Sequence, residues 1–482
     1  MSDATLKSLL ELSGLIHRRE ISIVELVRAY LDKIAKYDSG TGGLNSVLEI
    51  NGKALDIARR MDEHPAAAGS AGVLRGMPIL LKDNIDTGDT MHTSAGSLAL
   101  SDNRAPRDAD VAARLRACGA IILGKTNMTE FANRMTQGMP GGFSSRGGQV
   151  RSAYDRRQDP WGSSTGSAVA VSAGFCAAAL GTDTSNSIVA AALRNGVAGF
   201  RPPVHALSQN GVIPISFTLD SIGPITRNMG DLTAFYSELS GHPMPDFSSE
   251  TLAGKRLAVN IWNRDSLSQE INQSIDLVLS HLGAAGAVVE TVSLPATTNL
   301  KQIMKYEFKY AMNRYLRTAG SSMKSLADII AFNEQHAGQA LRHGQSCLID
   351  AQNNTTGRLI DDEYLSVMAD RKRQIEAIRQ VLAGYDACLM CSPNNVAHYT
   401  GLPSIALPNG LAADGMPAGL IMTGLDEIRL LAVACLMEEV CLKTPPPELC
   451  ESVRVTLDKL DSQPIRIHNH VDKQRFTNEN LC

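Results

Sequence analysis

The sequence lacks an excess of basic residues, a long apolar segment and a leader-like N-terminus. Its 482 residues carry a formal net charge of −4, and this balance gives no sign of a nucleic-acid partner. The first residues, Met1 to Lys7, contain neither a basic nor a long apolar region, so we expect no secretory signal. The alanine-rich run over residues 168–180 is too short and too interrupted to span a bilayer, so we expect no membrane association.

The sequence also lacks the paired cysteines of a disulfide framework. Its nine cysteines are an odd number scattered over a long chain, and this pattern favours a reducing, cytoplasmic compartment. Cys388 and Cys391 have the spacing of a redox or zinc pair, but their apolar run contains no second pair, which predicts buried strand cysteines. His468 and His470 have no acidic or cysteine partner close behind them. We therefore expect no metal site.

The sequence does contain the ingredients of a large globular α/β protein. Hydrophobic residues make up 44% and charged residues 20%, and the length allows a large core. Ser22 and Glu25 form a capping box before apolar residues at helix spacing. Residues 78–81 are predicted to be a buried strand with Lys82 at its C-terminal end, followed by a helix at 109–117 and a strand at 121–123. This alternation predicts an α/β fold, with a large mixed, largely parallel twisted sheet sandwiched between helices.

The second half of the chain repeats the alternation and adds a helical segment. A further strand–helix–strand unit is predicted over residues 256–294, and residues 304–343 are rich in helix formers. Strands at 387–391, 404–407 and 419–422 and a helix at 427–442 follow, before Thr444 and three prolines end the compact part. We predict one domain over residues 1–445, with a helical insertion at about 300–345 and a polar C-terminal extension over 446–482.

The densest group of small hydroxyl-bearing residues lies between Trp161 and Ser187. Residues 162–167 are too rich in Gly and Ser for regular structure, residues 168–180 form a buried apolar stretch, and residues 181–187 form a second small-residue turn. Two such turns at the ends of one buried segment predict a functional site. A phosphate-binding loop is one alternative, but the lysine of that motif is missing after Gly166. Simple close packing is another.

Six motifs follow one another along the chain, at residues 76–85 (GMPILLKDNI), 124–132 (GKTNMTEFA), 145–149 (SRGGQ), 162–168 (GSSTGSA), 181–188 (GTDTSNSI) and 220–227 (DSIGPITR). In this order they resemble the amidase signature family. The resemblance runs from about residue 6 to about residue 442 and implies the amidase signature fold. Residues 145–149 and 187–189 are most similar to the peptide-amidase-like branch.

The resemblance implies hydrolysis of a carboxylic amide, at a C–N bond other than an ordinary peptide bond, by a Ser-Ser-Lys triad. Ser187 would be the nucleophile that forms an acyl-enzyme, and Lys82 the general base. Ser163 would be the bridging serine, and in the family its peptide bond is cis. The oxyanion would rest on backbone N–H groups of the turn that ends at the nucleophile, from Thr184, Ser185 and Asn186. The reaction needs neither a metal nor an organic cofactor, and its substrate is a small linear amide.

The residue chemistry sets a condition on Lys82. Serine and lysine can cleave an amide without histidine, but an unperturbed ammonium, with a pKa of about 10.4, stays protonated at neutral pH. Burial lowers this pKa, and the apolar strand before Lys82 is consistent with partial burial. Asp83 and Asp86 would raise it if they lay close to the amine.

Several residues are candidates for substrate contact. We expect Met128, Phe131 and Ser164 to bind the substrate. Met128 and Phe131, together with Met135, Met139 and Phe143, either line an apolar acyl pocket or belong to the ordinary core. The other pocket walls are expected from the helical insertion and from the segment after Cys391.

The nucleophile turn departs from the family pattern. Asn186 stands where the family generally has Gly directly before the nucleophile, and it tolerates left-handed backbone better than other non-glycine residues. Its side chain would, however, crowd the place of the substrate carbonyl. Further departures are Ser185 for another Gly, Val189 for Arg, Pro203 for Thr or Ser, and a short segment between residues 393 and 401.

Two alternatives to an amide hydrolase stay open, and the departures favour the first but, with the branch resemblance, argue against the second. One is a catalytically impaired family member that acts as a binding protein. The other is the A subunit of a tRNA-dependent amidotransferase, which shares the signature but works with partner proteins. For the hydrolase we expect a monomer or a homodimer, with no nucleic-acid partner.

Overall fold

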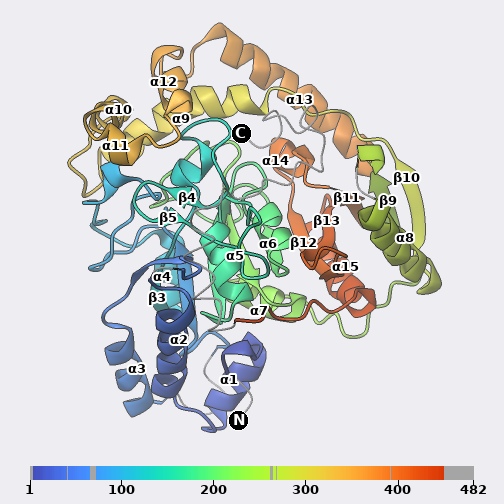
Figure 1. Ribbon diagram of the computed structural model, residues 1–482. Helices are drawn as coiled ribbons and strands as arrows, with labels where there is room; N and C mark the ends of the chain where they lie inside the picture. The colour runs from blue at the N-terminus through green and yellow to red at the C-terminus, as the bar shows by residue number, and fades with distance from the viewer. Residues whose placement is uncertain are drawn as a thin grey trace.

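The computed structural model describes residues 4–40, 42–65, 72–260, 264–266, 269–390 and 392–449. A sheet of 11 strands runs through them (Figure 1). Its strands are β1 (Val47–Ile50), β2 (Pro78–Lys82), β3 (Ile121–Thr126), β6 (Ala178–Asp183), β7 (Ala198–Arg201), β8 (Ser221–Thr226), β9 (Arg256–Asn260), β10 (Val288–Val292), β11 (Ala387–Met390), β12 (Ser404–Leu411) and β13 (Pro417–Thr423). A separate two-stranded ribbon consists of β4 (Phe143–Ser144) and β5 (Gly148–Gln149).

The strand order in the sheet is β1-β3-β2-β6-β8-β7-β12-β13-β11-β9-β10. The parallel pairs lie in two stretches, β3–β2–β6 and β11–β9–β10, and the strands between these stretches pair antiparallel. The large mixed sheet confirms the predicted fold, while its antiparallel centre was not part of the prediction. Because β2 and β6 are parallel neighbours, with Leu81 opposite Leu180, their C-terminal ends lie at the same edge of the sheet.

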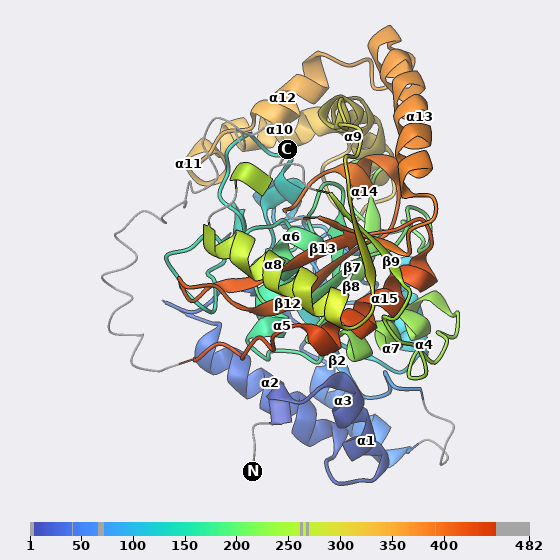
Figure 2. The ribbon, with the colours of Figure 1, turned by 90° about the vertical axis from the view of Figure 1, so that its right-hand side faces the viewer.

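Helices surround the sheet (Figures 1 and 2). They are α1 (Leu9–His17), α2 (Ile23–Tyr37), α3 (Ala54–Glu63), α4 (Asp110–Ala117), α5 (Thr165–Ser172), α6 (Val189–Arg194), α7 (Met229–Ser240), α8 (Gln269–Ala284), α9 (Leu300–Leu316), α10 (Leu326–Gln335), α11 (Ala337–Ala340), α12 (Ser346–Asn353), α13 (Asp362–Leu382), α14 (Val396–Thr400) and α15 (Glu427–Val440). The helices α5 and α6 pack against each other, and α4, α7, α15 and α8 form a second connected group. Among the helices of the described residues, none is both long and apolar enough to cross a membrane.

Local sequence explains where several elements begin. Ser22 caps α2, and its hydroxyl and backbone exchange hydrogen bonds with Glu25 as the predicted capping box requires. The strand β2 is buried along its whole length: β3 and β6 pair with its two edges, and α2 and α5 pack against it. Cys388 is buried in β11, as predicted, whereas Cys391 lies outside the described residues, as do His468 and His470.

The segment between Trp161 and Ser187 is more regular than its composition predicts. The helix α5 begins at Thr165, inside the run that the sequence indicated as irregular. The small residues allow this because the helix starts against the ends of neighbouring segments: a Cβ on Gly166 would lie 2.2 Å from the carbonyl oxygen of Asn127. The apolar stretch after it is divided between α5, which ends at Ser172, and β6, which begins at Ala178.

The helices α9 to α13 gather at one end of the molecule, drawn in yellow and orange at the top of Figure 1. The described residues form two hydrophobic clusters, a large one around the sheet and a smaller second one. The second cluster joins this helical layer to the segment before the β4–β5 ribbon. Within it, the rings of Phe131 and Phe308 meet edge to face. The division of the chain into one domain with an insertion stays a prediction. Of the predicted C-terminal extension, residues 450–482 lie outside the described part of the chain.

Candidate active site

The C-terminal end of β2 carries a fully buried lysine into a group of neutral oxygen atoms. Lys82 Nζ donates to Ser163 Oγ at 2.8 Å, to Thr182 Oγ1 at 2.9 Å and to the Thr182 carbonyl oxygen at 3.1 Å. Thr182 is in β6, the parallel neighbour of β2, and Ser163 lies just before α5. Because these three acceptors are uncharged, the ammonium is solvated here by hydroxyl and carbonyl oxygens rather than by a carboxylate.

The second serine extends this group by one more hydrogen bond. Ser163 Oγ donates to Ser187 Oγ at 2.9 Å, and the backbone N–H of Ser164 donates to the Ser187 carbonyl at 3.1 Å. The Gly162–Ser163 peptide bond is cis, as the family resemblance implied. Lys82 and Ser163 are completely buried, while Ser187 is 5% exposed. The structure thus brings the three predicted catalytic residues into one continuous hydrogen-bonded row.

The surroundings of Lys82 change its proton affinity. Burial lowers the pKa of Lys82 to about 7, although the carboxylates of Asp183 and Asp220 act in the opposite direction. At neutral pH a large fraction of the amine is therefore unprotonated, which is the state required of a general base.

The two aspartates that follow Lys82 in the sequence, Asp83 and Asp86, interact with side chains other than Lys82. The Asp83 carboxylate lies 3.5 Å from an Arg146 guanidinium nitrogen, and Asp86 accepts a hydrogen bond from the Tyr315 hydroxyl at 2.8 Å. The charge of Asp83 is therefore balanced by Arg146, and Asp86 is hydrogen-bonded to Tyr315. They are not among the charges that act on the pKa of Lys82.

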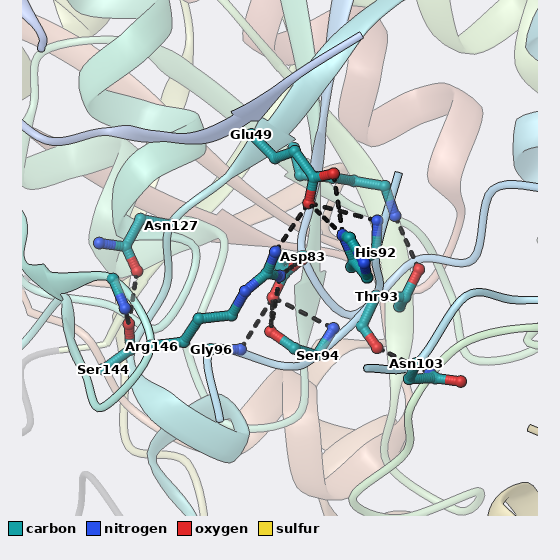
Figure 3. A network of polar contacts seen from close by, with 12 residues as sticks. Glu49, Asp83, His92, Thr93, Ser94, Gly96, Asn103, Asn127, Ser144 and Arg146 are labelled. Carbon is teal, nitrogen blue, oxygen red and sulfur yellow. Dashed lines mark hydrogen bonds and ion pairs between the residues drawn. The ribbon is translucent and has the colours of Figure 1, made fainter. Parts of the chain in front are cut away.

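Arg146 belongs to a polar network that includes Asp83, the residue after Lys82 (Figure 3). It donates to Glu49 at 2.7 Å, and His92 Nδ1 lies 3.0 Å from the same carboxylate. The Asp83 carboxylate also accepts from the backbone N–H groups of Ser94 at 3.2 Å and Gly96 at 3.0 Å. The network joins the end of β2 to the 94–96 loop, and thereby fixes the backbone next to Lys82.

The turn predicted to carry the nucleophile, called the nucleophile turn below, runs from Thr184 to Ser187. Asn186 has φ 71°, the left-handed conformation that the sequence required of it. Within the described residues, no acceptor is found for the backbone N–H groups of Ser185, Asn186 and Ser187. Such free donors beside a nucleophile can stabilise a developing oxyanion.

Side chains hold this turn at both ends. Thr184 Oγ1 donates to Asp220 Oδ1 at 2.6 Å. The carboxamide of Asn186 is buried, and its Nδ2 donates to Asn395 Oδ1 at 3.0 Å. The position of the Asn186 side chain is therefore set by a residue more than 200 positions away in the sequence.

A buried charge cluster lies directly before the turn. Asp183 accepts hydrogen bonds from the N–H groups of Ile188 at 2.7 Å and Val189 at 3.2 Å, and His398 Nε2 lies 2.9 Å from its Oδ1. The Arg201 guanidinium is 3.9 Å away. Burial opposes ionisation of Asp183, but these partners outweigh it and hold the pKa of the carboxyl well below its usual range.

The loop that carries Asp220 is anchored to the helical layer. Asp220 Oδ2 accepts from the backbone N–H groups of Ile215 and Ser216, at 2.9 and 3.0 Å. Glu307 of α9 is completely buried and accepts from Ser216 Oγ at 2.5 Å and from the N–H of Thr218 at 3.1 Å. A further hydrogen bond to Glu307 comes from the Tyr364 hydroxyl of α13 at 2.8 Å. Two helices of the layer thus support the oxyanion turn through one carboxylate.

The predicted substrate-binding residues have different surroundings, one polar and two apolar. Ser164 is buried, and its hydroxyl donates to the Thr182 carbonyl at 3.0 Å. Met128 and Phe131 are buried in the second hydrophobic cluster, which also contains Met135, Met139 and Phe143. Phe131 and the next residue have φ 46° and 51°, so this segment makes a left-handed turn. The role of these residues in substrate binding stays a prediction.

Sequence reasoning missed four residues that organise the site: Thr182, Asp220, Asn395 and His398. Thr182 and Asp220 lie inside the motifs, so their spacing from the serines was the available signal. Asn395 and His398 lie in a short segment with no motif, and only the folded chain brings them to the nucleophile turn.

Comparison with known proteins gives concordant results. The amidase family model matches residues 25–395. A probable amidase of Arabidopsis thaliana is 32% identical over 469 residues, which cover 90% of this chain and 89% of that protein. The A subunit of a glutamyl-tRNA(Gln) amidotransferase from Prochlorococcus marinus is 30% identical over 87% of this chain and 94% of its own length. The X-ray structure of a peptide amidase from Stenotrophomonas maltophilia matches with a TM-score of 0.84 and 34% identity, over 92% of this chain and 98% of that one.

Proposed function

The chain belongs to the amidase family, and on this premise we propose that it hydrolyses a carboxylic amide through a Ser-Ser-Lys triad. Lys82 is the general base, Ser163 the bridging serine and Ser187 the nucleophile. The scissile bond is a C–N bond other than an ordinary peptide bond, and the substrate is a small linear amide. The observation that supports the proposal most is the row of hydrogen bonds from Lys82 through Ser163 to Ser187, at 2.8 and 2.9 Å.

Acylation begins from the neutral amine of Lys82. Ser187 Oγ attacks the carbonyl carbon while its proton passes to Ser163 Oγ, and the Ser163 proton passes to Lys82 Nζ. Backbone N–H groups of the nucleophile turn stabilise the oxyanion. Lys82 then returns its proton through Ser163 to the leaving nitrogen. The C–N bond breaks, ammonia or an amine departs, and the acyl group remains on Ser187 as an ester.

Deacylation uses the same row in reverse. A water molecule gives a proton through Ser163 to Lys82 as its oxygen attacks the ester carbonyl. When the second tetrahedral intermediate collapses, Ser187 leaves and recovers its proton from the triad. The products are a carboxylic acid and the free enzyme, so no external oxidant, reductant or cofactor enters the balance.

A panel of amides tests the proposal directly. Primary amides, peptide amides and anilides are incubated with the purified protein, and release of ammonia or amine is followed. We expect turnover of at least one class and its loss in Ser187→Ala. The matched control is Ser172→Ala, which removes another buried serine hydroxyl at the far end of α5. Turnover that survives Ser187→Ala would exclude the assigned nucleophile, and absence of turnover with every amide would exclude the hydrolase.

A second candidate is the A subunit of a tRNA-dependent amidotransferase, because the Prochlorococcus marinus relative carries that name. In this case the protein would take ammonia from glutamine and act together with partner proteins. The mass of the purified protein in solution and its response to glutamyl-tRNA distinguish the two. A stable monomer or homodimer whose amide turnover ignores glutamyl-tRNA argues for the hydrolase.

The third candidate is a binding protein with an impaired site, because Asn186 replaces the usual glycine in the oxyanion turn. A fluorophosphonate probe separates this candidate from the other two, since the probe labels only an activated serine. We expect labelling at Ser187, identified by mass spectrometry of the modified peptide. An unlabelled Ser187 in folded protein would favour the binding protein.

A further inference from the structure

The short helix α14 contacts the nucleophile turn on both sides. Asn395, the residue before α14, accepts a hydrogen bond from Asn186 Nδ2 at 3.0 Å. His398, within α14, places Nε2 2.9 Å from Asp183 Oδ1. Asp183 directly precedes the turn, and Asn186 directly precedes Ser187. One segment of the chain therefore contacts Asp183, the residue directly before the turn, and Asn186, the third residue of the turn.

The contact with Asp183 reaches the backbone on the other side of Ser187. The Asp183 carboxylate accepts from the N–H groups of Ile188 and Val189, the first two residues after the nucleophile. His398 therefore fixes the carboxylate that fixes this backbone. The Arg201 guanidinium, at 3.9 Å, and His398 Nε2, at 2.9 Å, both lie against Asp183 Oδ1, so His398 contacts the carboxylate by close polar approach and Arg201 supplies the balancing charge.

The helix itself is firmly held. His398 and Tyr399 are almost completely buried, and the carbonyl oxygen of Tyr399 accepts from Arg371 Nε of α13 at 2.7 Å. The carbonyl of Leu402, just after the helix, accepts from Arg201 at 2.7 Å. Because its own position is set by α13 and by β7, α14 can impose a position on the turn.

We propose that α14 clamps the nucleophile turn in its reactive conformation, with Asn395 and His398 as positioning residues that act through Asn186 and Asp183. The inference rests on the proposed function, because the clamp matters for catalysis only if Ser187 is the nucleophile. It also accounts for Asn186 at a position of the family's glycine: its carboxamide is tied to α14 and so takes part in holding the turn.

The Asn395 contact is tested by a double-mutant cycle. Asn395→Leu removes the acceptor and should lower kcat about 10- to 100-fold with little change in KM, because a displaced nucleophile slows chemistry more than binding. Asn395→Asp keeps an acceptor oxygen and should retain most of the rate. In an Asn186→Gly background, Asn395→Leu should have no further effect on kcat. An equal loss in both backgrounds would overturn the action through Asn186.

The His398 contact is tested by a matched pair. His398→Gln retains an N–H donor within reach of Asp183, whereas His398→Leu removes it. We expect the leucine variant to lose about 10- to 100-fold in kcat and in the rate of fluorophosphonate labelling, and the glutamine variant to recover most of both. The control is Thr400→Val, because the Thr400 hydroxyl donates to carbonyls of α14 itself. Equal losses in His398→Gln and Thr400→Val would reduce α14 to a structural element.

Crystal structures of Asn395→Leu and His398→Leu give a readout that does not depend on activity. We expect the Thr184–Ser187 turn to shift in both variants while the sheet stays in place. A turn that keeps its conformation overturns the clamp even if the wild-type protein hydrolyses amides. Conversely, a turn that shifts in a protein without amidase activity supports the clamp and rejects the proposed function.

Discussion

Two buried lysines at the ends of neighbouring parallel strands have opposite surroundings. Lys82 ends β2 and faces the hydroxyl groups of Ser163 and Thr182. Lys125 of β3 is equally buried, and its Nζ donates to the Ile85 carbonyl at 2.5 Å and to Thr93 Oγ1 at 2.8 Å. Burial lowers the pKa of both lysines. Two carboxylates, those of Asp183 and Asp220, act against it at Lys82, and four, those of Asp83, Asp86, Asp89 and Glu49, act against it at Lys125.

The difference shows what makes a buried lysine a base. Burial alone disfavours the ammonium, and nearby carboxylates restore it. Lys125 donates a hydrogen bond to Thr93, a residue of the polar network that Figure 3 labels, and its positive charge balances acidic groups of that network. Lys82 is separated from that network because Asp83, its neighbour in sequence, directs its carboxylate to Arg146. The two adjacent strands therefore carry lysines on which different numbers of carboxylates act, two at Lys82 and four at Lys125.

The largest expected effect is on the rate after removal of Lys82. Lys82→Met should lower kcat by about 10⁴-fold or more, because the nucleophile then has no base. Lys125→Met, the matched change on the neighbouring strand, should keep kcat per folded molecule within about tenfold of wild type. Steady-state amide hydrolysis with both variants measures this. Comparable losses of kcat would mean that the two lysines do not differ in function.

The second effect concerns the free energy of unfolding, for which we expect Lys125→Met, and not Lys82→Met, to be the more damaging variant. Lys125→Met leaves buried carboxylates without their balancing charge and should lower the free energy of unfolding by about 3–5 kcal/mol. Lys82→Met removes an amine on which two carboxylates act rather than four, and it should cost less. Urea unfolding followed by circular dichroism compares the two. A larger loss in Lys82→Met would contradict the assignment of Lys125 to charge balance.

The third prediction is the pH dependence of the rate. In the proposed mechanism the neutral amine of Lys82 is the base, and its fraction grows as pH rises through its pKa of about 7. The value of kcat/KM should therefore rise about tenfold per pH unit at acidic pH and level off above about pH 7. An uncharged amide substrate measured between about pH 5 and about pH 9 gives the profile. A rate that falls as pH rises through this pKa would exclude Lys82 as the base.

The smallest effect tests the hydroxyl surroundings themselves. Thr182→Val removes one acceptor of the ammonium and so disfavours its charged form, which should move the midpoint of the pH profile down by about half a unit to one unit. Thr182→Ser retains the hydroxyl and is the control. An upward shift in the valine variant would show that Thr182 does not stabilise the ammonium.

The sequence was sufficient for features that are local or carried by a motif. The capping box of α2 and the strand that delivers Lys82 follow from short-range patterns. The residues Lys82, Ser163 and Ser187 were identified by family motifs, and the structure brings their side chains together. Their catalytic roles remain to be tested by the variants described above.

The remaining features depend on contacts between distant segments. Asn186 and Asn395 meet only after β12, α6 and the nucleophile turn are assembled, and nothing near either residue predicts the other. The start of α5 was missed because glycine and serine favour loops in isolation, whereas here small size lets the helix approach Asn127. The opposite directions of Lys82 and Asp83 likewise depend on partners supplied by other strands and loops.

The anchoring of the oxyanion turn to Glu307 matters for any attempt to redesign this protein. The helical insertion is predicted to form part of the pocket wall, and exchange of the α9–α13 layer for that of a relative would then be a route to altered selectivity. Glu307 and Tyr364 belong to this layer, yet they secure the loop that carries Asp220. A chimaera that omits them would receive a new binding wall and lose a support of its reaction centre. Grafts should therefore retain both side chains together with the residues of the 215–220 loop that they hold.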